Sequence, residues 1–421
     1  IVTRLKGGDP YVFGRGGEEG ELLKEEGIEF EVVPGITSAI GGLCYAGIPI
    51  THRDHASSFH VITGHLRDDD KENPEINWNA LANTNGTLVF LMGVANLQKI
   101  SSNLIKEGKS KDTPVALISW ATRYNQRVIT STLENVYETA VRENVKPPTL
   151  IAVGDVVELR YKLNFFESKP LFGKNVIVTR SRTQSSSLVS KISDLGGNPI
   201  EVPTIKIEKI ENNIALENEI KNIKDYTYLI LTSKNAVDIF FDKLDEMDLD
   251  SRVLANLKVC AIGSATAKEI KNRGIKADIV PEKFVAEYLF EELKDILKDS
   301  DKVLIPRAKN ARDFLVDKIS EICEVKEVHI YETLLDDSKK DEVLDILNSG
   351  EADYITFASS STVTNFVDII GKENIDKLNE LKVISIGPIT TQTAKSLNIN
   401  VYNEAEVSTI DGMIDSIMND K

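Results

Sequence analysis

The second half of the chain contains the same pattern of strand, turn and helix twice. The segment YLILTSKNAVDIFF at 228–241 matches YITFASSSTVTNFV at 354–367, because in each an apolar strand leads into a hydroxyl-rich turn and then a helix with aromatic residues. The next units also match, since VCAIGSATAKEIKNRGIKADI at 259–279 parallels VISIGPITTQTAKSLNINV at 383–401. A repeat of this size predicts two lobes that share one architecture.

An extended segment precedes each copy of the repeat. VPTIKIEKI at 202–210 and VHIYETLLD at 328–336 are typical of strands, and together they predict a two-stranded hinge. Because one such segment precedes each copy, residues 175–203 are expected to return to the other lobe as its first βα unit. We therefore expect lobe one at 175–203 plus 335–421, lobe two at 209–328, and hinge strands at 204–208 and 329–334.

The first half forms a separate module. Strand-like runs such as FHVIT, GTLVFLM, PVALIS and TLIAVG alternate with helix-like runs such as VANLQKISSNLIKEG, a βα rhythm typical of a parallel sheet. Breaks around PGITSAI and AGIPITHRD predict that this module is itself bilobal. Pro170 and Gly173, just before the new strand NVIVTR, mark the boundary. The prediction is an α/β chain with a first module at 1–168, a linker at 169–174 and a second module at 175–421.

Composition narrows the classes of function. A formal net charge of -16 argues against a nucleic-acid binder, although a small acidic ligand responds to local charge. The three cysteines, Cys44, Cys260 and Cys323, are far apart in the sequence, which argues against disulfides and zinc and favours a reducing cytoplasm. No apolar run is long enough to span a bilayer, and residues 1–20 lack the regions of a signal peptide.

Polar turns follow five predicted strands of the second half. In doubly wound sheets ligands bind beyond the carboxyl ends of the strands, where backbone N–H groups, hydroxyls and helix N-termini favour carboxylates. Helix capping is the alternative interpretation, because Ser and Thr are also ordinary N-caps. The residues of these turns that we expect to bind substrate are Thr179, Arg180, Thr232, Ser233, Ser264, Ser360 and Thr390.

Other residues that carry chemistry are few. Tyr331 lies in the second hinge segment, where a phenol could donate a proton into the cleft, although most strand tyrosines are structural. Four histidines, at 52, 55, 60 and 65, crowd into THRDHASSFHVITGH, but none of them forms a helical i, i+4 pair. We therefore predict no metal site.

A glycine turn near the start of the chain could hold a ligand. Gly7, Gly8 and Asp9 form a turn that lets the backbone approach a ligand closely, and Gly16-Gly17 leads into a helix that begins near Glu18. Gly-Gly-Asp also occurs in ordinary loops, so the turn alone does not identify the ligand.

Several motifs of the first module, taken in order, resemble one enzyme family. The motifs are LKGGDPYVFGRGGEE, VVPGITSA, GIPITHRD, VFLMGV and TLIAVGDVVELR, and over residues 1 to about 168 they resemble the uroporphyrinogen-III C-methyltransferases of the tetrapyrrole methylase family. The resemblance implies S-adenosylmethionine in a cleft between two α/β lobes, methyl transfer to pyrrole carbons of uroporphyrinogen III, and a homodimer formed through this module.

The resemblance also implies which residues meet cofactor and substrate. It places Arg15 and Arg53 as partners of the substrate carboxylates. The family's first strand, its GxGPGD loop, and its proton-handling acid and lysine belong ahead of residue 1, so we expect the chain to be a piece of a longer one; the alternative is an inactive module. The implied cofactor contacts are Gly7, Gly8, Asp9, Val12, Thr37, Ser38, Met92 and Ala121.

From Asn175 to Lys421 the chain looks like uroporphyrinogen-III synthase. The motifs are VIVTR, LTSKNAVDIF, AIGSATA, PEKFVAEYL, VHIYET, FASSSTVTNF and SIGPITTQTA. The resemblance implies that linear hydroxymethylbilane is converted to uroporphyrinogen III with loss of water, inversion of the last ring and closure of the macrocycle, without a cofactor. It also implies that Tyr331 is the acid that helps the hydroxyl group leave, and that the polar turns bind carboxylates.

The two implied activities are consecutive, because the product of the synthase is the substrate of the methyltransferase. We therefore predict a bifunctional cytoplasmic enzyme of the sirohaem and cobalamin branch, with small-molecule substrates and neither nucleic acid nor membrane as partner. One alternative is a synthase with a methylase remnant. Another is a bilobal anion-binding protein without catalysis, since two similar lobes on a hinge can close on a ligand without chemistry.

Overall fold

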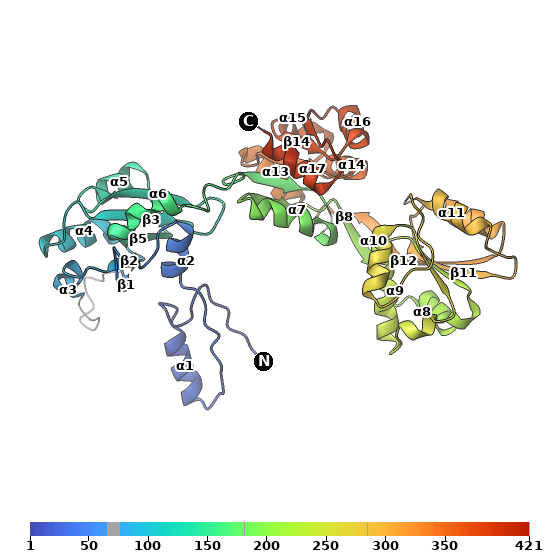
Figure 1. The fold of residues 1–421 in the computed structure, drawn as a ribbon, viewed down its shortest axis with the longest axis horizontal. Coiled ribbons are helices and arrows are strands. Elements are labelled where there is room, and N and C mark those ends of the chain that lie inside the picture. The colour runs from blue at the N-terminus through green and yellow to red at the C-terminus, as the bar shows by residue number, and fades with distance from the viewer. Residues whose placement is uncertain (65–75, 181, 284, 421) are drawn as a thin grey trace.

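Three α/β bodies follow one another along the longest axis of the computed structural model (Figure 1). The structure describes residues 1–64, 76–180, 182–283 and 285–420. Within those ranges each body is built on one five-stranded sheet. The first module is at one end, lobe one is in the middle and lobe two is at the other end.

The sheet of the first module is mixed, not parallel. β1 and β2 are parallel, whereas β5 is antiparallel to both β2 and β3, and β3 is antiparallel to β4. The parallel order expected from the βα rhythm is therefore wrong for most of this sheet. Only seven residues separate Ser119 from Arg127, too few for a crossover, so the chain turns back as a hairpin. The sheet order is β1 (Phe59–Thr63), β2 (Thr87–Leu91), β5 (Thr149–Val153), β3 (Pro114–Ser119) and β4 (Arg127–Thr132).

Helices cover both faces of this sheet because its central strands bury apolar side chains on both faces. β2 and β5 are buried along their whole length. One face packs with α4 and α5 around Phe90 and Leu104, and the other packs with α2 around Leu43 and Ile118. The helices of this module are α1 (Gly16–Glu25), α2 (Ser38–Tyr45), α3 (Trp78–Ala82), α4 (Leu97–Lys106), α5 (Val136–Arg142) and α6 (Arg160–Leu163), with 3-10 turns η1 (Val94–Asn96) and η2 (Asp155–Leu159).

Residues 1–58 contain α1 and α2 but no strand. The part before α2 forms an arm that extends away from the sheet and carries α1, whereas α2 packs on the sheet (Figure 1). Of the two lobes predicted for this module, the one that includes residues 1–58 therefore has no sheet within the part of the chain that the structure describes.

Lobe one is built from two distant parts of the chain. β6 pairs in parallel with both β7 and β13, so the structure places residues 175–201 in the same sheet as the C-terminal strands. The sheet order is β15 (Val401–Glu404), β14 (Lys382–Ser385), β13 (Tyr354–Phe357), β6 (Asn175–Val178) and β7 (Asn198–Glu201), and its helices are α7 (Arg182–Asp194), α13 (Lys340–Ser349), α14 (Ser360–Ile370), α15 (Ile375–Leu378), α16 (Pro388–Ser396) and α17 (Ile410–Met418), with η5 (Lys372–Asn374).

Lobe two repeats this plan on a separate sheet. β9, β10, β11 and β12 are parallel, and their buried faces pack around Phe240 and Leu289. The sheet order is β10 (Lys258–Ala261), β9 (Tyr228–Leu231), β11 (Lys302–Ala308), β12 (Glu324–Leu335) and β8 (Ile205–Lys209), and its helices are α8 (Ile214–Lys221), α9 (Lys234–Glu246), α10 (Ser264–Asn272), α11 (Ala286–Lys294) and α12 (Phe314–Ser320), with η3 (Ile223–Asp225) and η4 (Ser251–Leu254).

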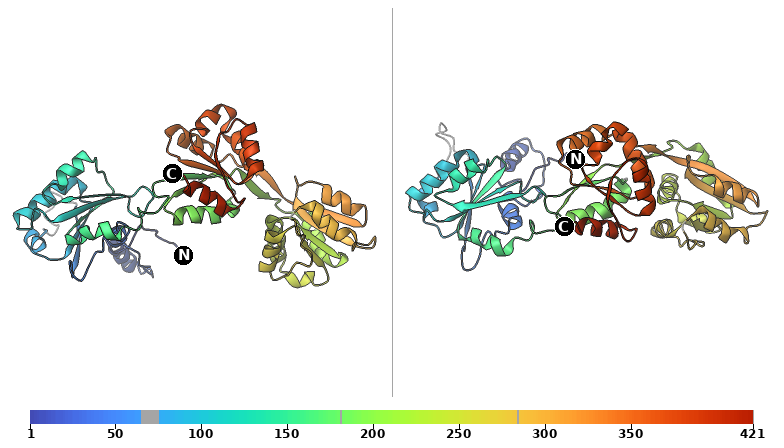
Figure 2. Two further views of the ribbon diagram at one scale, coloured as in Figure 1. Left: turned by 45° about the horizontal axis from the view of Figure 1, so that its top comes forward. Right: turned by 90° about the horizontal axis from the view of Figure 1, so that it is seen from above.

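Two antiparallel strands connect the lobes (Figure 2). β8 pairs with the second half of β12, from Lys209 opposite Tyr331 to Ile205 opposite Leu335. The strand bounds differ from the expected 329–334, because β12 begins at Glu324 and its first half pairs with β11 inside lobe two. The second hinge strand is therefore the continuation of a core strand, which fixes its orientation to lobe two.

Candidate functional site

The predicted cofactor turn packs against a second glycine turn. The Asp9 carboxylate accepts hydrogen bonds from the Tyr11 N–H at 2.9 Å and from the Gly35 N–H at 3.1 Å. Gly8 has φ 86°, a left-handed conformation that favours glycine. A Cβ added at Gly35 would lie 2.2 Å from the Gly8 carbonyl oxygen. The turns at 7–9 and 34–37 therefore touch through their backbones, and only glycine allows this approach.

Helix α2 links these turns to the sheet. Thr37 is its N-cap, with a hydroxyl that accepts from the Ala39 N–H at 3.4 Å, and Ser38 is its first residue. Farther along the helix, a Cβ added at Gly42 would lie 3.2 Å from the Ala121 Cβ. The structure thus connects the PGITSA segment to the glycine turn at one end of α2 and to Ala121 through the body of the helix.

The remaining predicted cofactor residues lie at one edge of this sheet. Met92 follows β2 and Ala121 follows β3, and these strands end at the same edge because both are antiparallel to β5. Met92, Trp120 and Thr122 have φ values of 58°, 49° and 72°, conformations that are costly for residues other than glycine. Such strain clusters at functional sites. Sequence reasoning missed Trp120 and Thr122, since nothing in the sequence signals a backbone angle there.

The other predicted residues of this module are less closely tied to the turn. Val12 is part of it, because its N–H donates to the Asp9 carbonyl at 3.2 Å. Arg15 is exposed at the N-cap of α1 with Glu18 at 4.0 Å. Arg53 is exposed in the turn between His52 and Ala56. No contact among the described residues brings either arginine to the glycine turn.

In lobe two the predicted acid lies next to a predicted binding residue. Tyr331 is buried in β12, and its phenol oxygen lies 2.9 Å from the Ser233 Oγ. Ser233 is the N-cap of α9, and its Oγ accepts from the Ala236 N–H at 3.0 Å. The hydroxyl pair therefore joins the hinge strand to the carboxyl end of β9. Both residues were predicted separately, but the sequence did not show that they meet.

The polar turns of both lobes follow the carboxyl ends of parallel strands. In lobe two Thr232 is half-buried and Ser264 is exposed as the first residue of α10. In lobe one Ser360 is the first residue of α14, where its Oγ donates to the Ile389 carbonyl at 3.3 Å. These residues are accessible to a ligand, and the helix N-termini beside them favour anions.

Two predicted threonines are used inside the protein. The Thr179 hydroxyl is buried and donates to the Thr356 carbonyl at 2.7 Å. Thr390 is buried within the first turn of α16. Arg180, which follows Thr179, is half-buried, and burial lowers the pKa of its guanidinium, as expected for a cation taken out of water. Of these three side chains, Arg180 is the one with charge to offer a carboxylate.

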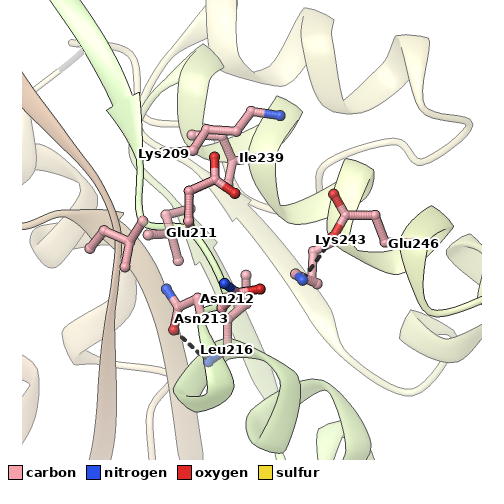
Figure 3. A pocket seen from close by; sticks show the side chains of 10 residues that line it. Lys209, Glu211, Asn212, Asn213, Leu216, Ile239, Lys243 and Glu246 are labelled. Atoms are coloured by element: carbon pink, nitrogen blue, oxygen red, sulfur yellow. Dashed lines mark hydrogen bonds and ion pairs between the residues drawn. The ribbon is translucent and has the colours of Figure 1, made fainter.

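A small polar cavity in lobe two is a poor candidate for the substrate site (Figure 3). It holds about 40 Å³ and lies where β8 ends, beside Lys209, Asn213 and Lys243. Several of its polar groups already have partners, because the Asn213 amide donates to the His329 carbonyl at 2.7 Å and Lys243 pairs with Glu246 at 2.8 Å. This volume suits about one water.

The described ranges hold no group of three histidine, cysteine, aspartate or glutamate side chains that could bind a metal. His52 and His55 stack at 5.0 Å between ring centroids, His60 lies on β1, and His65 falls outside the described residues. Among the helices that are described, none is both long and apolar enough to cross a membrane.

Comparisons with known families match both halves. A family model described as "Uroporphyrinogen-III synthase HemD" matches residues 186–415, and one described as "Tetrapyrrole (Corrin/Porphyrin) Methylases" matches residues 1–137. The porphyrin biosynthesis protein HemD of Ruminiclostridium josui is 43% identical over 99% of this chain and 82% of its own length.

Two further comparisons match single modules. An S-adenosyl-L-methionine-dependent uroporphyrinogen III methyltransferase of Methanosarcina barkeri is 55% identical over 38% of this chain and 62% of its own length. The crystal structure of a mutant uroporphyrinogen III synthase from Thermus thermophilus covers 58% of this chain and 97% of that one, at 17% identity and a TM-score of 0.42.

Proposed function

Because the chain belongs to the uroporphyrinogen-III synthase family described as HemD and carries a tetrapyrrole methylase segment in front of it, we propose that it catalyses two consecutive steps of tetrapyrrole synthesis. The second module converts hydroxymethylbilane to uroporphyrinogen III, and the first transfers methyl groups from S-adenosylmethionine to that product. The observation that carries the synthase assignment is the Tyr331–Ser233 pair at the polar edge of lobe two.

Loss of water is the synthase step that needs an acid. The phenol of Tyr331 gives its proton to the leaving hydroxyl, the C–O bond breaks, and water departs. The electrophilic methylene that remains is attacked by the substituted carbon of the last pyrrole ring. The bond from that carbon to its own methylene bridge then breaks, and the freed methylene is attacked by the ring's unsubstituted carbon, which loses a proton, so the macrocycle closes with the last ring inverted. Ser233 supports this role, because its Oγ lies 2.9 Å from the phenol oxygen and is fixed by the Ala236 N–H. A buried donor held in this way is ready for general acid catalysis.

The polar turns position the substrate. Ser264 and Ser360 stand at helix N-termini in lobes two and one, and Arg180 adds a cation in lobe one. A flexible linear tetrapyrrole with several carboxylates loses much freedom when both lobes hold it, and this positioning contributes to the rate. We propose that the lobes close on the substrate about β8 and β12.

The first module fits the cofactor through its backbone. Gly7 faces open space, since a Cβ added there would meet nothing within 4 Å. Gly8 has a left-handed φ, which lets the backbone turn sharply at this point. When bound, S-adenosylmethionine supplies the methyl group. We propose that the turn at 7–9 and the start of α2 hold the carboxylate and ribose end, while Met92 and Ala121 provide apolar surface.

The full reaction tests this proposal. The chain is incubated with hydroxymethylbilane and S-adenosylmethionine, and the products are resolved by isomer and methyl count after oxidation. Methylated type III product is expected. Unmethylated type III product would instead favour the synthase with a methylase remnant, and type I product alone would favour the non-catalytic binding protein.

Tyr331→Phe tests the acid directly. We expect type III formation to fall about 10²- to 10⁴-fold, the usual contribution of a general acid. The fold should survive, because Ser233 keeps its bond to Ala236. Tyr226→Phe is the matched control, since Tyr226 is also buried in lobe two and its phenol binds Glu219. Full turnover by folded Tyr331→Phe would remove Tyr331 from the mechanism.

The cellular setting follows from the same proposal. We propose a cytoplasmic location, because Cys44, Cys260 and Cys323 are far apart in the sequence and favour a reducing compartment. The homodimer through the first module stays a prediction.

A further inference from the structure

A cavity of about 510 Å³ lies between the first module and lobe one. The first module contributes Tyr45 and the segment 122–124, the region between the modules contributes Phe165, Phe166 and Lys169, and lobe one contributes residues from Ser193 to Pro199. The volume lies within the range of small-molecule sites. We call it the junction cavity.

On the side of the first module the junction is held by a buried hydrogen-bond network. The Gln126 amide is buried and donates to the Tyr45 carbonyl at 3.1 Å and to the Glu167 carboxylate at 2.8 Å. Arg160 donates to the Ala46 carbonyl at 2.6 Å and also pairs with Glu167. The Arg160–Glu167 pair is partly buried, and removing one partner would leave the other charge poorly solvated. The segment that leaves the first module is therefore fixed to it rather than a loose tether.

Lobe one packs on the other side of the same segment. The Leu171 N–H donates to the Leu195 carbonyl at 2.9 Å, and the Asn198 N–H donates to the Lys174 carbonyl at 2.8 Å. Gly196, with φ 87°, lies so close that an added Cβ would be 2.8 Å from the Lys169 Cβ. The walls of the cavity are thus set by contacts on both sides.

The lining combines aromatic rings with two cations. Tyr45 lies 5.7 Å from Phe165 and 4.8 Å from Phe166 between ring centroids, and the residues Tyr45 and Phe165 are 37% and 50% exposed. Lys169 lies over the Phe166 ring at 5.6 Å, and Arg123 lies over the Trp120 ring at the same distance. Flat apolar walls beside cations match a flat ligand with carboxylates at its rim.

We propose that the junction cavity binds a carboxylated tetrapyrrole, with Arg123 and Lys169 pairing with carboxylates and Tyr45 and Phe165 contacting the macrocycle. The cavity serves the methylase module, because Thr122 directly follows Ala121 at the cofactor edge. On the lobe one side it meets the start of β7, away from the carboxyl edge where the synthase turns lie. The proposal rests on the proposed function and adds a site to which the synthase module contributes a wall.

The test is a fluorescence titration of the full chain with uroporphyrin III, the oxidised form of uroporphyrinogen III. The double variant Arg123→Ala/Lys169→Ala should bind at least about tenfold more weakly, since it removes two charge-assisted contacts. Asp194→Asn should bind more tightly, because it removes the acid that lines the same cavity.

A matched control removes two cations elsewhere. Lys258→Ala/Lys283→Ala deletes lysines of lobe two that also lie over tyrosine rings, and it should leave the titration unchanged. If the junction double variant and its control have the same affinity for uroporphyrin III, the inference is wrong.

Turnover separates this inference from the proposed function. Weaker porphyrin binding by the junction variant in a chain that makes methylated type III product supports both. Weaker binding by that variant in a chain without turnover retains the porphyrin site and overturns the proposed function. Unaltered binding by that variant in a chain with full turnover overturns the junction site and leaves the proposed function standing.

Discussion

Gly35→Ala should lower methyl transfer about 10²-fold while leaving the synthase intact. The added Cβ would lie 2.2 Å from the Gly8 carbonyl oxygen, 2.7 Å from its carbonyl carbon and 3.2 Å from the Asp9 nitrogen. All three contacts are with backbone, so no side-chain rotation relieves them. Ordinary contact requires the two turns to separate by about 1 Å, and a shift of that size at a site can cost about 10² in rate.

The same separation weakens the bond that organises the turn. The Gly35 N–H donates to Asp9 at 3.1 Å, and a further 1 Å takes this pair beyond hydrogen-bond distance. We therefore expect S-adenosylhomocysteine to bind about 10²-fold more weakly, measured by isothermal titration calorimetry. Type III formation should be unchanged, because the synthase lies in another module.

Gly17→Ala is the matched control. Gly17 is in the first turn of α1, a Cβ there would meet nothing within 4 Å, and alanine is the better helix former. This variant should bind S-adenosylhomocysteine as the unaltered chain does. Unaltered binding by Gly35→Ala would refute the assignment of the cofactor to these turns.

Two further predictions concern lobe stability and thiol reactivity. Hydrogen bonds from Lys382, Tyr354 and Tyr402 hold the pKa of Asp420 well below its usual range, so the stability that Asp420 contributes is present at neutral pH and is lost as the pH falls through the acidic range. Asp420→Asn should lower the free energy of unfolding of lobe one by about 1–3 kcal/mol in urea titrations at pH 7 and make it less dependent on acidic pH. Equal stability of the two chains at pH 7 would contradict this. Burial raises the pKa of the Cys260 thiol to about 12. An alkylating reagent at neutral pH should therefore modify the exposed Cys44 in the folded chain and Cys260 only in denaturant, as measured by mass spectrometry of peptides. Modification of Cys260 in the folded chain would contradict its burial.

The arrangement of the second half could be anticipated because its signals are local and repeated. An apolar run such as YLIL, followed by turn residues, predicts a buried strand, and a serine in that turn, such as Ser233, predicts the N-cap of the next helix. Two copies of that unit define two sheets, and the extended segments between them define the connection. The turn at Gly7 and Gly8 could likewise be predicted, since paired glycines indicate a backbone that approaches a ligand or another segment closely.

Tertiary structure alone decided which of these residues meet. Strand direction in the first module depends on the short β3–β4 connection and on how β5 fits between β2 and β3, which no βα rhythm specifies. The Tyr331–Ser233 pair joins residues 98 positions apart. The sequence predicted that Thr179 binds substrate, but its hydroxyl donates to the Thr356 carbonyl of the neighbouring strand.

The junction cavity shows the same division most clearly. In the sequence, none of its parts indicates a binding site: they are an aromatic pair, a lysine in a linker and a Gly-Gly turn. Hydrophobic pattern and turn chemistry act between neighbours in the chain, so the sequence determined the strands, helices and caps. Long-range packing and hydrogen bonds such as those of Gln126 and Glu167 act between residues that only the folded chain brings together, so the structure alone determined the sites.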